Sequence, residues 1–498
     1  MTQPDSQHRA HSPDSDPSRP PSDTDTSLAN EDLLPTKQTW NWYNIFAFWM
    51  SDVHSVGGYV FAGTLFTLGL QSWQIFLVLV GGICIVMLLA NLIAEPSQKS
   101  GVPFPVIARL SFGVYGANIP ALIRGIIAIV WYGIQTYLAS VALSIILLRV
   151  FPGLAVLTEH SFLNLSYLGW IGFLSMWALQ TALFLMKMDA IKVFMDWAGP
   201  AVYLVMFMLM GWIVYQAGWS EISLSLSEKT LTPLETLGQA LVGTSLIVAY
   251  FAGPTLNFGD FSRYCRSMKD VRRGNFWGLP VNFTVFSLIS VVIISGTPAV
   301  FGRMIEDPME TIGLIDNTTM VVLLAFTFVT ATVGVNIVAN FVSAAFDVSN
   351  VAPDRISWRG AGLIAAVASA LLTPWNLYDS PAIIHYTIDM LAAFIGPLYG
   401  ILIVDYRLVQ HRKIDVADLF SNAPGGRYWY CGGVNPVALK ALVPAASLGI
   451  LCVTLPALNL LANFSFFVGM STSGLLYYWL ARGRAAAGAP ASGAPVDR

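Results

Sequence analysis

The sequence predicts an all-α membrane protein in which twelve helices cross the bilayer. Only 11% of its 498 residues are charged and 55% are hydrophobic, whereas a soluble globular chain carries about 25% charged residues. Its mean hydropathy is positive, at +0.63. Apolar stretches long enough to cross the hydrocarbon core recur along the whole chain. These observations exclude an ordinary soluble protein.

Apolar windows place the twelve helices near residues 44–70, 74–95, 118–148, 164–187, 190–218, 236–258, 276–301, 318–346, 357–374, 383–405, 437–460 and 462–481. Several windows are too long for a straight crossing, so those helices must tilt or break. Residues 1–36, rich in Ser, Asp, Pro and Thr, and residues 485–498, rich in Ala, Gly and Pro, are predicted to be disordered tails. They leave one transmembrane domain at residues 37–484.

Lysine and arginine are distributed unequally between the two sides of the predicted bundle. Loops on the amino-terminal side hold seventeen of them, including Arg109 and Arg124. The opposite side holds three, Arg149, Lys229 and Arg303. Because positive charge is retained on the cytoplasmic side of membrane proteins, both termini are expected in the cytoplasm.

The first helix contains a polar run from Asp52 through His54 to Ser55, followed by Gly57 and Gly58. A charged side chain at the bilayer centre costs about 3 kcal/mol on insertion scales, so Asp52 is a functional candidate. Glycine weakens a helix and frees backbone groups, and secondary transporters build binding sites at the membrane midplane from such broken helices. The alternative is a helix that begins later and leaves Asp52 and His54 near the headgroups.

The sixth helix carries a matching irregularity five spans later, at Ala252-Gly253-Pro254. Proline removes a backbone donor and clashes with the preceding turn, so this helix is expected to kink or unwind there. Broken helices at corresponding positions of two halves predict an inverted repeat of five plus five helices, followed by two further helices. The prediction rests on the two breaks, because the sequence shows no convincing repeat at the level of residues.

Two other helices place polar or aromatic side chains four residues apart on one face. They are Trp131 and Gln135 in the third helix, and Asn336 and Asn340 in the eighth. An amide side chain offers both donors and an acceptor, which suits the lactam edge of a pyrimidine or hydantoin ring. An indole face can stack on the same ring. Packing and interhelical hydrogen bonds would explain these residues without any ligand.

Tyr250 and Phe251, beside the sixth-helix break, would supply a second aromatic wall. The predicted site is then a slot with two aromatic faces and an amide-rich edge, suited to a neutral planar heterocycle. Asp260 and Arg263, at the cytoplasmic end of the same helix, are expected to anchor a loop as a charge pair.

Several functional classes are disfavoured by the sequence. No zinc-ligand spacing, nucleophile elbow or phosphate loop occurs, so the chain is expected neither to be an enzyme nor to carry a cofactor. No basic block indicates nucleic-acid binding. A channel would need a ring of carbonyls or charges along a pore, which one asymmetric polar run does not supply.

Six segments of the chain are specific in combination: Trp40–Asn44, Trp131–Thr136, Asn257–Tyr264, Asn336–Asn340, Gly396–Gly400 and Asp405-Tyr406. The most specific motifs among them are Trp-x-Gly-x-Gln-Thr at Trp131–Thr136 and Asp-Phe-Ser-Arg within Asn257–Tyr264. With these segments the chain, from about Trp40 to Arg484, resembles the nucleobase:cation symporter-1 family. That family includes bacterial permeases for hydantoins, allantoin, uracil and cytosine.

The resemblance implies the inverted-repeat fold of the amino-acid and hydantoin symporters, working by alternating access. It places the substrate between Trp131 and Phe251, and Gln135 and Asn340 would bond the ring amides. The family often has tryptophan at the position of Phe251, so the slot here is expected to be wider or to stack less strongly. Other positions implied to lie near the ring are Asn336 and Ser55, or His54 if the register slips by one residue.

The coupling ion is where the chain departs from part of the family. Sodium-coupled members hold the ion with backbone carbonyls of the first and eighth helices and with two adjacent hydroxyl side chains of the eighth. The matching positions here are Gly334 and Val335, which carry no side-chain oxygen. Thr330 or Thr332 could replace them only with a register shift, so no metal site is expected. A proton is the other possible ion, and Asp52 or His54 could carry it, because a buried acid and a histidine can both change charge near neutral pH.

We therefore expect a monomeric, proton-coupled importer of a uracil-, allantoin- or hydantoin-like ring in a bacterial cytoplasmic membrane. Its partners would be the heterocycle, the proton and the lipid bilayer. A sodium-coupled symporter of cytosine- or hydantoin-like substrates is the alternative, and a channel is a remote one.

Overall fold

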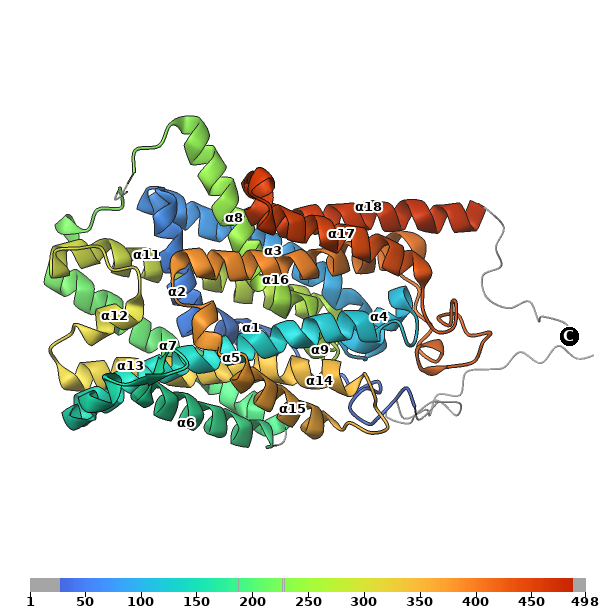
Figure 1. The fold of residues 1–498 in the computed structure, drawn as a ribbon, viewed down its shortest axis with the longest axis horizontal. Coiled ribbons are helices and arrows are strands. Elements are labelled where there is room, and N and C mark those ends of the chain that lie inside the picture. Colours follow the sequence, from blue (N-terminus) through green and yellow to red (C-terminus); the bar gives the residue numbers. More distant parts are fainter. Residues whose placement is uncertain (1–26, 187, 226, 228, 487–498) are drawn as a thin grey trace, which may run out of the picture.

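Long helices run side by side along the longest axis of the molecule (Figure 1). The structure is a computed structural model that describes residues 27–186, 188–225, 227 and 229–486. Within these ranges, nine helices are long and apolar enough to cross a membrane. Three shorter apolar helices, Val56–Leu68, Val202–Ala217 and Trp358–Leu371, lie where the remaining predicted spans were placed. The described helices are thus compatible with twelve crossings.

The first half of the chain forms α1 (Trp42–Val53), α2 (Val56–Thr64), α3 (Ser72–Ser100), α4 (Phe104–Phe112), α5 (Asn118–Val150), α6 (Tyr167–Phe184) and α7 (Met188–Ala217). An antiparallel pair, β1 (Ser161–Phe162) and β2 (Leu165–Ser166), precedes α6.

The second half forms α8 (Pro233–Leu256), α9 (Gly259–Ser262), α10 (Met268–Phe276), α11 (Asn282–Phe301), α12 (Pro308–Gly313), α13 (Thr318–Val335), α14 (Ser343–Ser349), α15 (Trp358–Leu371), α16 (Pro381–Val404), α17 (Pro436–Thr454) and α18 (Ser465–Ala486). π-helical turns at Trp277–Val281 and Asn336–Val342 join α10 to α11 and α13 to α14 into continuous spans.

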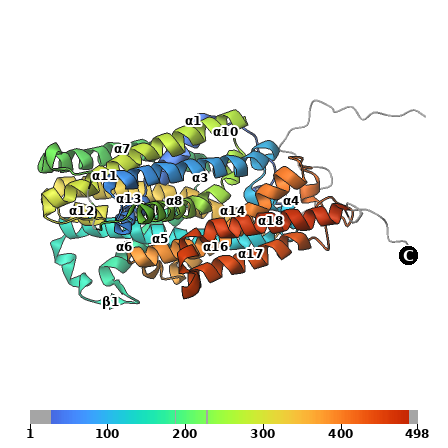
Figure 2. The same ribbon diagram turned by 90° about the horizontal axis from the view of Figure 1, so that it is seen from above.

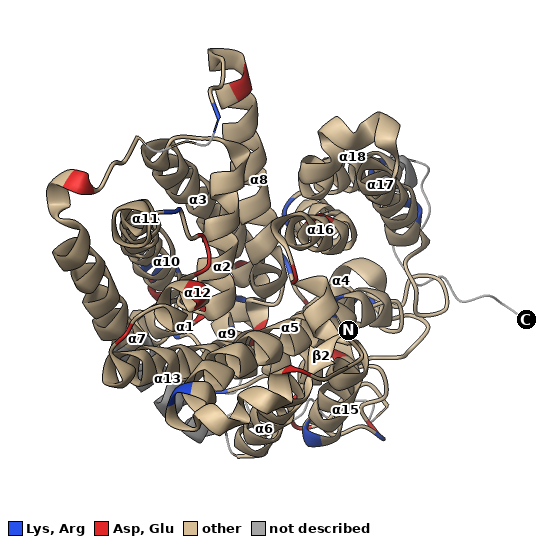
Figure 3. Ribbon diagram, turned by 60° about the vertical axis from the view of Figure 1, so that its left-hand side comes forward, with Lys and Arg blue, Asp and Glu red and all other residues tan. Residues whose placement is uncertain are grey.

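The helices divide into a central group and a side group. In the centre α5 packs on α13 and α3 packs on α8. The side group consists of α16, α17 and α18, which pack on one another, and Figure 2 shows α17 and α18 at the edge opposite α7. Charged residues are sparse along the helices, and a few lie inside the bundle (Figure 3). Those few are candidates for function, because a buried charge is costly.

The predicted break in the first helix is confirmed. α1 ends at Val53 and α2 begins at Val56. The hydroxyl of Ser55 caps α2 by accepting a hydrogen bond from the backbone N–H of Gly58 at 3.0 Å. A Cβ at Gly58 would lie 2.8 Å from the carbonyl oxygen of Val53, so the chain can turn this tightly only with glycine. The break therefore follows directly from the local sequence.

The first helix does not begin later than predicted, as the alternative supposed. α1 begins at Trp42, which places Asp52 about 15 Å further along the helix axis at 1.5 Å per residue. Asp52 and His54 are both buried inside the bundle.

The sixth helix was predicted to kink or unwind at Ala252-Gly253-Pro254, and it does not unwind there. α8 continues through Ala252-Gly253-Pro254 and ends at Leu256, and a turn at Asn257 and Phe258 separates it from α9. Proline removes only the hydrogen bond to the carbonyl four residues earlier, and the packed helix tolerates that loss for the rest of the turn. The predicted unwinding thus lies one turn later than expected.

Residues 27–36, assigned by composition to the amino-terminal tail, lie against the bundle. Leu28 and Leu33 are buried. Arg109 donates a hydrogen bond to the carbonyl of Leu28 at 2.7 Å, and Arg263 donates one to the carbonyl of Asp32 at 2.9 Å. Residues 1–26 and 487–498 of the predicted tails lie outside the described residues.

Candidate functional site

A small cavity lies in the centre of the bundle, beside the break between α1 and α2. Its lining residues come from α1, α5, α8 and the α13–α14 span: Asp52, Trp131, Gln135, Tyr250, Pro254, Val335, Ala339 and Asn340. Five of these were predicted site residues, although they come from four separate helices. The volume is about 20 Å³, which holds about one water molecule. The site is therefore closed in this structure.

Aromatic rings close one side of the cavity. The rings of Trp131 and Tyr250 meet edge to face, with centroids 5.2 Å apart. Tyr250 in turn stacks on Phe61, with centroids 4.5 Å apart and an angle of 9° between the planes. Tyr378 meets Trp131 edge to face at 6.1 Å, and its hydroxyl donates to the carbonyl of Gly57 at 3.0 Å. Trp131 and Tyr250 line the cavity, and Phe61 and Tyr378 pack behind them; we call these four rings the aromatic roof.

Phe251, predicted to be the second aromatic wall, does not line the cavity. Its ring packs edge to face on Phe283 at 5.5 Å, and only 2% of its surface is exposed. Successive helical residues point about 100° apart, so only one of the two aromatic neighbours in α8 can face the site. Tyr250 is that residue.

Gln135 is the amide with the greatest unused bonding capacity in the cavity. Its Nε2 lies 3.4 Å from the hydroxyl of Ser55, and its Oε1 has no hydrogen-bond partner within the protein. Ser55 contacts Gln135 and caps α2 but is not among the residues that line the cavity. A Cβ at Gly57 would lie 2.8 Å from Nε2 of Gln135, so glycine there makes room for the amide.

Asn340 and Asn336 have different surroundings although they are one helical turn apart. Asn340 lines the cavity, and its Nδ2 donates to Oδ1 of Asn336 at 3.0 Å. The Nδ2 of Asn336 donates to the carbonyl of Tyr132 at 2.9 Å, to Thr136 at 3.0 Å and to Oε1 of Gln180 at 2.7 Å. The side-chain amide of Asn336 thus has its hydrogen-bond partners within the protein, and it holds Asn340 in place.

His54 points away from the cavity. Its Nδ1 lies 2.8 Å from the hydroxyl of Tyr59, and its ring lies 4.2 Å from that of Tyr203 on α7. Phe286 of α11 packs edge to face on it at 5.6 Å. Of the two residues proposed to carry a proton, only Asp52 lines the cavity.

The two positions that hold sodium-binding hydroxyls in sodium-coupled members carry no side-chain oxygen here. Gly334 and Val335 occupy the positions expected to supply hydroxyls, and Val335 presents an apolar side chain to the cavity. The Thr332 hydroxyl accepts a hydrogen bond from the backbone N–H of Val56 at 3.1 Å. Among the described residues, no group of three His, Cys, Asp or Glu side chains could hold a metal ion.

A wider vestibule of about 370 Å³ lies behind the aromatic roof, and Tyr378 belongs to both. It contains four acidic residues, Glu306, Asp307, Glu310 and Asp379. Burial raises the pKa of the Asp307 carboxyl, which caps α12. The vestibule lining includes residues at the start of α12, and α12 lies at the end of the bundle opposite the end of α18 (Figure 1).

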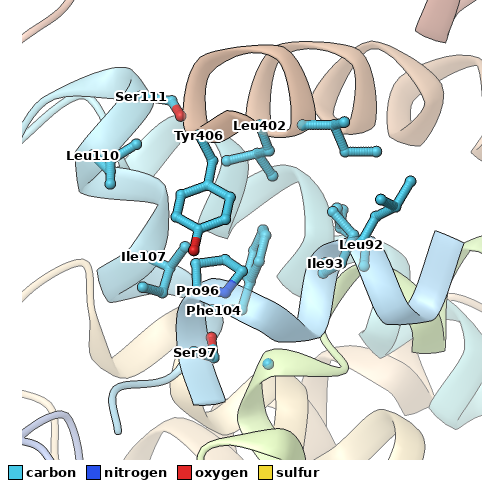
Figure 4. A pocket seen from close by; sticks show the side chains of 13 residues that line it. Leu92, Ile93, Pro96, Ser97, Phe104, Ile107, Leu110, Ser111, Leu402 and Tyr406 are labelled. Atoms are coloured by element: carbon cyan, nitrogen blue, oxygen red, sulfur yellow. The ribbon is translucent and has the colours of Figure 1, made fainter. Parts of the chain in front are cut away.

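A second small cavity, of about 20 Å³, lies among α3, α4 and α16 (Figure 4). Most of its lining is apolar, such as Leu92, Ile93 and Leu402, with Tyr406 reaching in from the end of α16. It has no amide side chain among its lining residues, so it does not suit a hydrogen-bonding ring.

Sequence reasoning missed Tyr378, Gln180 and the bond of Thr332 to the helix break. Tyr378 lies in the connection between α15 and α16, where no helical spacing relates it to the site. Gln180 is a fully buried amide on α6, and its position in an apolar span was the available signal.

Comparisons with known proteins agree on one family. Residues 34–481 match the family described as permease for cytosine/purines, uracil, thiamine, allantoin. The allantoin permease of Bacillus subtilis is 35% identical over 91% of this chain and 93% of its own length. The purine-uracil permease NCS1 of Arabidopsis thaliana is 32% identical over 84% and 70%. The structure of Mhp1, a nucleobase-cation-symport-1 family transporter with bromovinylhydantoin bound, superimposes with a TM-score of 0.75 and 21% identity, covering 93% of this chain and 97% of Mhp1.

Proposed function

Because the chain belongs to the family of permeases for cytosine/purines, uracil, thiamine and allantoin, we propose that it imports an allantoin-, uracil- or hydantoin-like ring by proton symport. One observation carries the proposal. Gln135 places an amide with an unpartnered oxygen in a closed cavity whose wall is the indole of Trp131. A buried amide without a partner costs about 1–3 kcal/mol, and a ring with a lactam edge removes that cost when it binds.

The chemistry of the cavity supports a planar ring with adjacent N–H and C=O groups. Gln135 and Asn340 each carry donors and an acceptor, and they line the cavity from different helices. The faces of Trp131 and Tyr250 would enclose the ring once they separate. A ring without the lactam edge would leave Oε1 of Gln135 without a partner, which is how a polar site rejects an apolar analogue.

Allantoin is the first substrate to test within this class. The permease of Bacillus subtilis that bears its name is 35% identical to this chain over nearly the whole length of both. Uracil is the second, because the 32% identical relative from Arabidopsis thaliana is named a purine-uracil permease.

The proposed coupling ion is a proton carried by Asp52. Asp52 lines the cavity, so protonation would remove the cost of enclosing a negative charge when the site closes over the ring. Sodium would lack both hydroxyl ligands, because Gly334 and Val335 stand at those positions. Sodium coupling remains the alternative, with the carbonyls around the helix break as its ligands.

The proposed setting is a bacterial cytoplasmic membrane, with a monomeric protein and both termini in the cytoplasm. The excess of Lys and Arg on the amino-terminal side supports this orientation. The acidic vestibule at the opposite end would then face outward and lead to the aromatic roof. Alternating access requires each end to open in turn around the fixed site.

Uptake of radiolabelled allantoin into cells that express the protein tests the proposal. A protonophore should abolish accumulation, and replacing sodium with choline should leave it unchanged. A panel of unlabelled heterocycles then ranks the substrates by competition. Uptake that required sodium and ignored the protonophore would contradict proton coupling, and no saturable uptake of any ring in the panel would contradict the substrate class.

A further inference from the structure

A second cluster of buried polar and ionisable side chains lies beneath the cavity, away from the aromatic roof. Its members are Arg124 of α5, Asn257 in the turn after α8, Asp260 of α9 and Asp347 of α14, and all four are 0% exposed. None of them lines the cavity. Arg124 had been counted among the loop charges, and Asp260 had been expected to anchor a loop. The structure buries both inside the bundle.

Arg124 joins the cluster to the floor of the cavity. Its Nε donates to the carbonyl of Gly253 at 3.0 Å, and its Nη2 donates to the carbonyl of Ala339 at 3.3 Å. Ala339 and the neighbour of Gly253, Pro254, both line the cavity. The guanidinium of Arg124 therefore cross-links α8 to the α13–α14 span, directly below the cavity in which the substrate ring is proposed to bind.

The cluster lies on the side of the cavity that leads to the two termini. Asp347 follows Asn340 by seven residues and Arg124 precedes Trp131 by seven, about 10 Å along each helix. Three residues beyond Asp347, Asn350 accepts a hydrogen bond from Arg109 at 2.6 Å. Arg109 also donates to the carbonyl of Leu28, in the segment before α1.

One amide nitrogen bridges the two carboxyl groups. The Nδ2 of Asn257 donates to Oδ2 of Asp260 at 3.1 Å and to Oδ2 of Asp347 at 3.0 Å. Oδ1 of Asp260 accepts a further hydrogen bond from the backbone N–H of Phe104 at 2.8 Å. Oδ1 of Asp347 has no hydrogen-bond partner, and neither has Nη1 of Arg124. The two carboxyl groups are thus unequally supported.

The contacts of this cluster favour one proton on its carboxyl groups. The two carboxyl groups share one amide donor, and no carboxylate oxygen among the described residues lies within 4.0 Å of Arg124 to form an ion pair. Adjacent buried carboxylates cannot both ionise without a large penalty. Both oxygens of Asp260 accept N–H bonds, which favour its ionised form. Oδ1 of Asp347 is the atom left to hold the proton.

Few other ionisable groups face the cluster. Asp52 on α1 and Tyr399 on α16 interact electrostatically with Arg124, and the Tyr399 hydroxyl donates to the carbonyl of Ala252 at 3.0 Å. Arg263, after α9, interacts with Asp260 and donates to the carbonyl of Gly101 at 3.0 Å. None of these groups makes a hydrogen bond to Asp347.

We propose that Asp347 is a second proton-binding site and that its proton keeps the floor of the cavity closed. With Asp347 neutral, Arg124 stays on the carbonyls of Gly253 and Ala339. When the O–H bond of Asp347 breaks and the proton passes to water at this end of the bundle, the carboxylate attracts the free Nη1 of Arg124. The guanidinium then leaves the two carbonyls, and the link between α8 and the α13–α14 span is lost. Proton release and opening of the floor are one event.

The inference rests on the proposed proton symport, and Asp347→Asn tests it. The asparagine imitates the neutral acid, so the floor should stay closed. We expect equilibrium binding of radiolabelled allantoin to purified protein within about threefold of wild type, and net uptake reduced by about 5- to 150-fold, the usual range of coupling between two sites. Asp347→Glu should recover part of the uptake and its pH dependence. Asp354→Asn, which makes the same change at a more exposed acid in the following loop, is the matched control and should behave as wild type.

Infrared difference spectra between acidic and alkaline buffer supply a readout that a purely structural role would not change. Wild type should show the carbonyl stretching band of a protonated carboxylic acid that Asp347→Asn lacks and that Asp347→Glu shifts. If the asparagine variant does not fold, the glutamate shift alone decides. A band unchanged in both variants, or net uptake by Asp347→Asn equal to wild type, overturns the inference. Failure of wild type to transport allantoin would count against the proposed function instead, because the infrared comparison needs no substrate.

Discussion

The hydroxyl of Thr332 accepts a hydrogen bond from the backbone N–H of Val56 at 3.1 Å. This bond ties the eighth predicted span to the break in the first, at the point where α2 begins. The N–H of Val56 belongs to the first turn of α2, so it has no partner within its own helix. A side chain from a distant part of the chain thus satisfies a backbone group that the break sets free.

Thr332→Val should destabilise the protein by about 1–3 kcal/mol, because it leaves the buried N–H of Val56 without a partner. Thermal unfolding in detergent measures the loss. Thr330→Val is the matched control, since the Thr330 hydroxyl bonds only the carbonyl of Phe326 in its own helix. Equal melting temperatures for the two variants would show that the bond to Val56 contributes no stability.

Gln135→Ala and Asn340→Ala should each weaken substrate binding at least about tenfold, because each removes an amide that lines the cavity. The folded state should survive both changes. Isothermal titration of purified protein with allantoin measures the effect, and size-exclusion chromatography checks the fold. Unchanged affinity in both variants would refute the proposed amide edge.

Asn336→Ala should mainly lower stability. Its side chain donates to Oε1 of Gln180 and accepts from Nδ2 of Asn340, so its removal leaves these two buried groups without a partner, at about 1–3 kcal/mol each. The melting temperature should therefore fall more for Asn336→Ala than for Asn340→Ala. The reverse order would mean that Asn336 serves the ligand and not the packing of α5, α6 and α13.

Gly57→Ala should weaken allantoin binding without unfolding the protein. The added Cβ would lie 2.8 Å from the Gln135 amide, and the flexible side chain must then move out of position. Gly81→Ala on α3 is the matched control, because a Cβ there has no neighbour within 4 Å. The apparent KM for uptake separates the two variants. A KM equal to that of the control would indicate that Gln135 has room to adjust.

Trp131→Ala should abolish measurable binding, whereas Phe251→Leu should change affinity by less than about threefold. Trp131 lines the cavity and Phe251 packs on Phe283 behind it, so a hydrophobic replacement of Phe251 leaves the residues that line the cavity in place. Competition assays with unlabelled allantoin compare the two. A larger effect at Phe251 would restore the sequence-based assignment of the second wall.

The sequence was informative wherever a local rule links residues to geometry. The polar run with two glycines located the helix break, and the spacing of four residues placed Trp131 and Gln135 together on one face. It could not choose between Tyr250 and Phe251, because that choice depends on how α8 is rotated against α5. The sequence also could not show that Asn336 bonds to other protein groups instead of the ligand, because its partner amide, Gln180, is 156 residues away.

His54 and Asp52 illustrate the same limit across the break. Both lie in one short polar run, yet Asp52 lines the cavity and His54 packs among Tyr59, Tyr203 and Phe286. The break changes the direction of the chain between them, so helical periodicity does not apply. Only the positions of α7 and α11 decide which side chain meets the ligand.

The closed cavity, with room for about one water molecule, has a consequence for measured affinities. A ring can enter only those molecules in which the roof or floor has already opened, so the apparent Kd equals the intrinsic Kd divided by the fraction that is open. Substitutions that favour opening can therefore tighten binding without touching the ligand. Ranking variants by affinity alone would confuse such changes with better contacts, and association rates are needed to tell them apart.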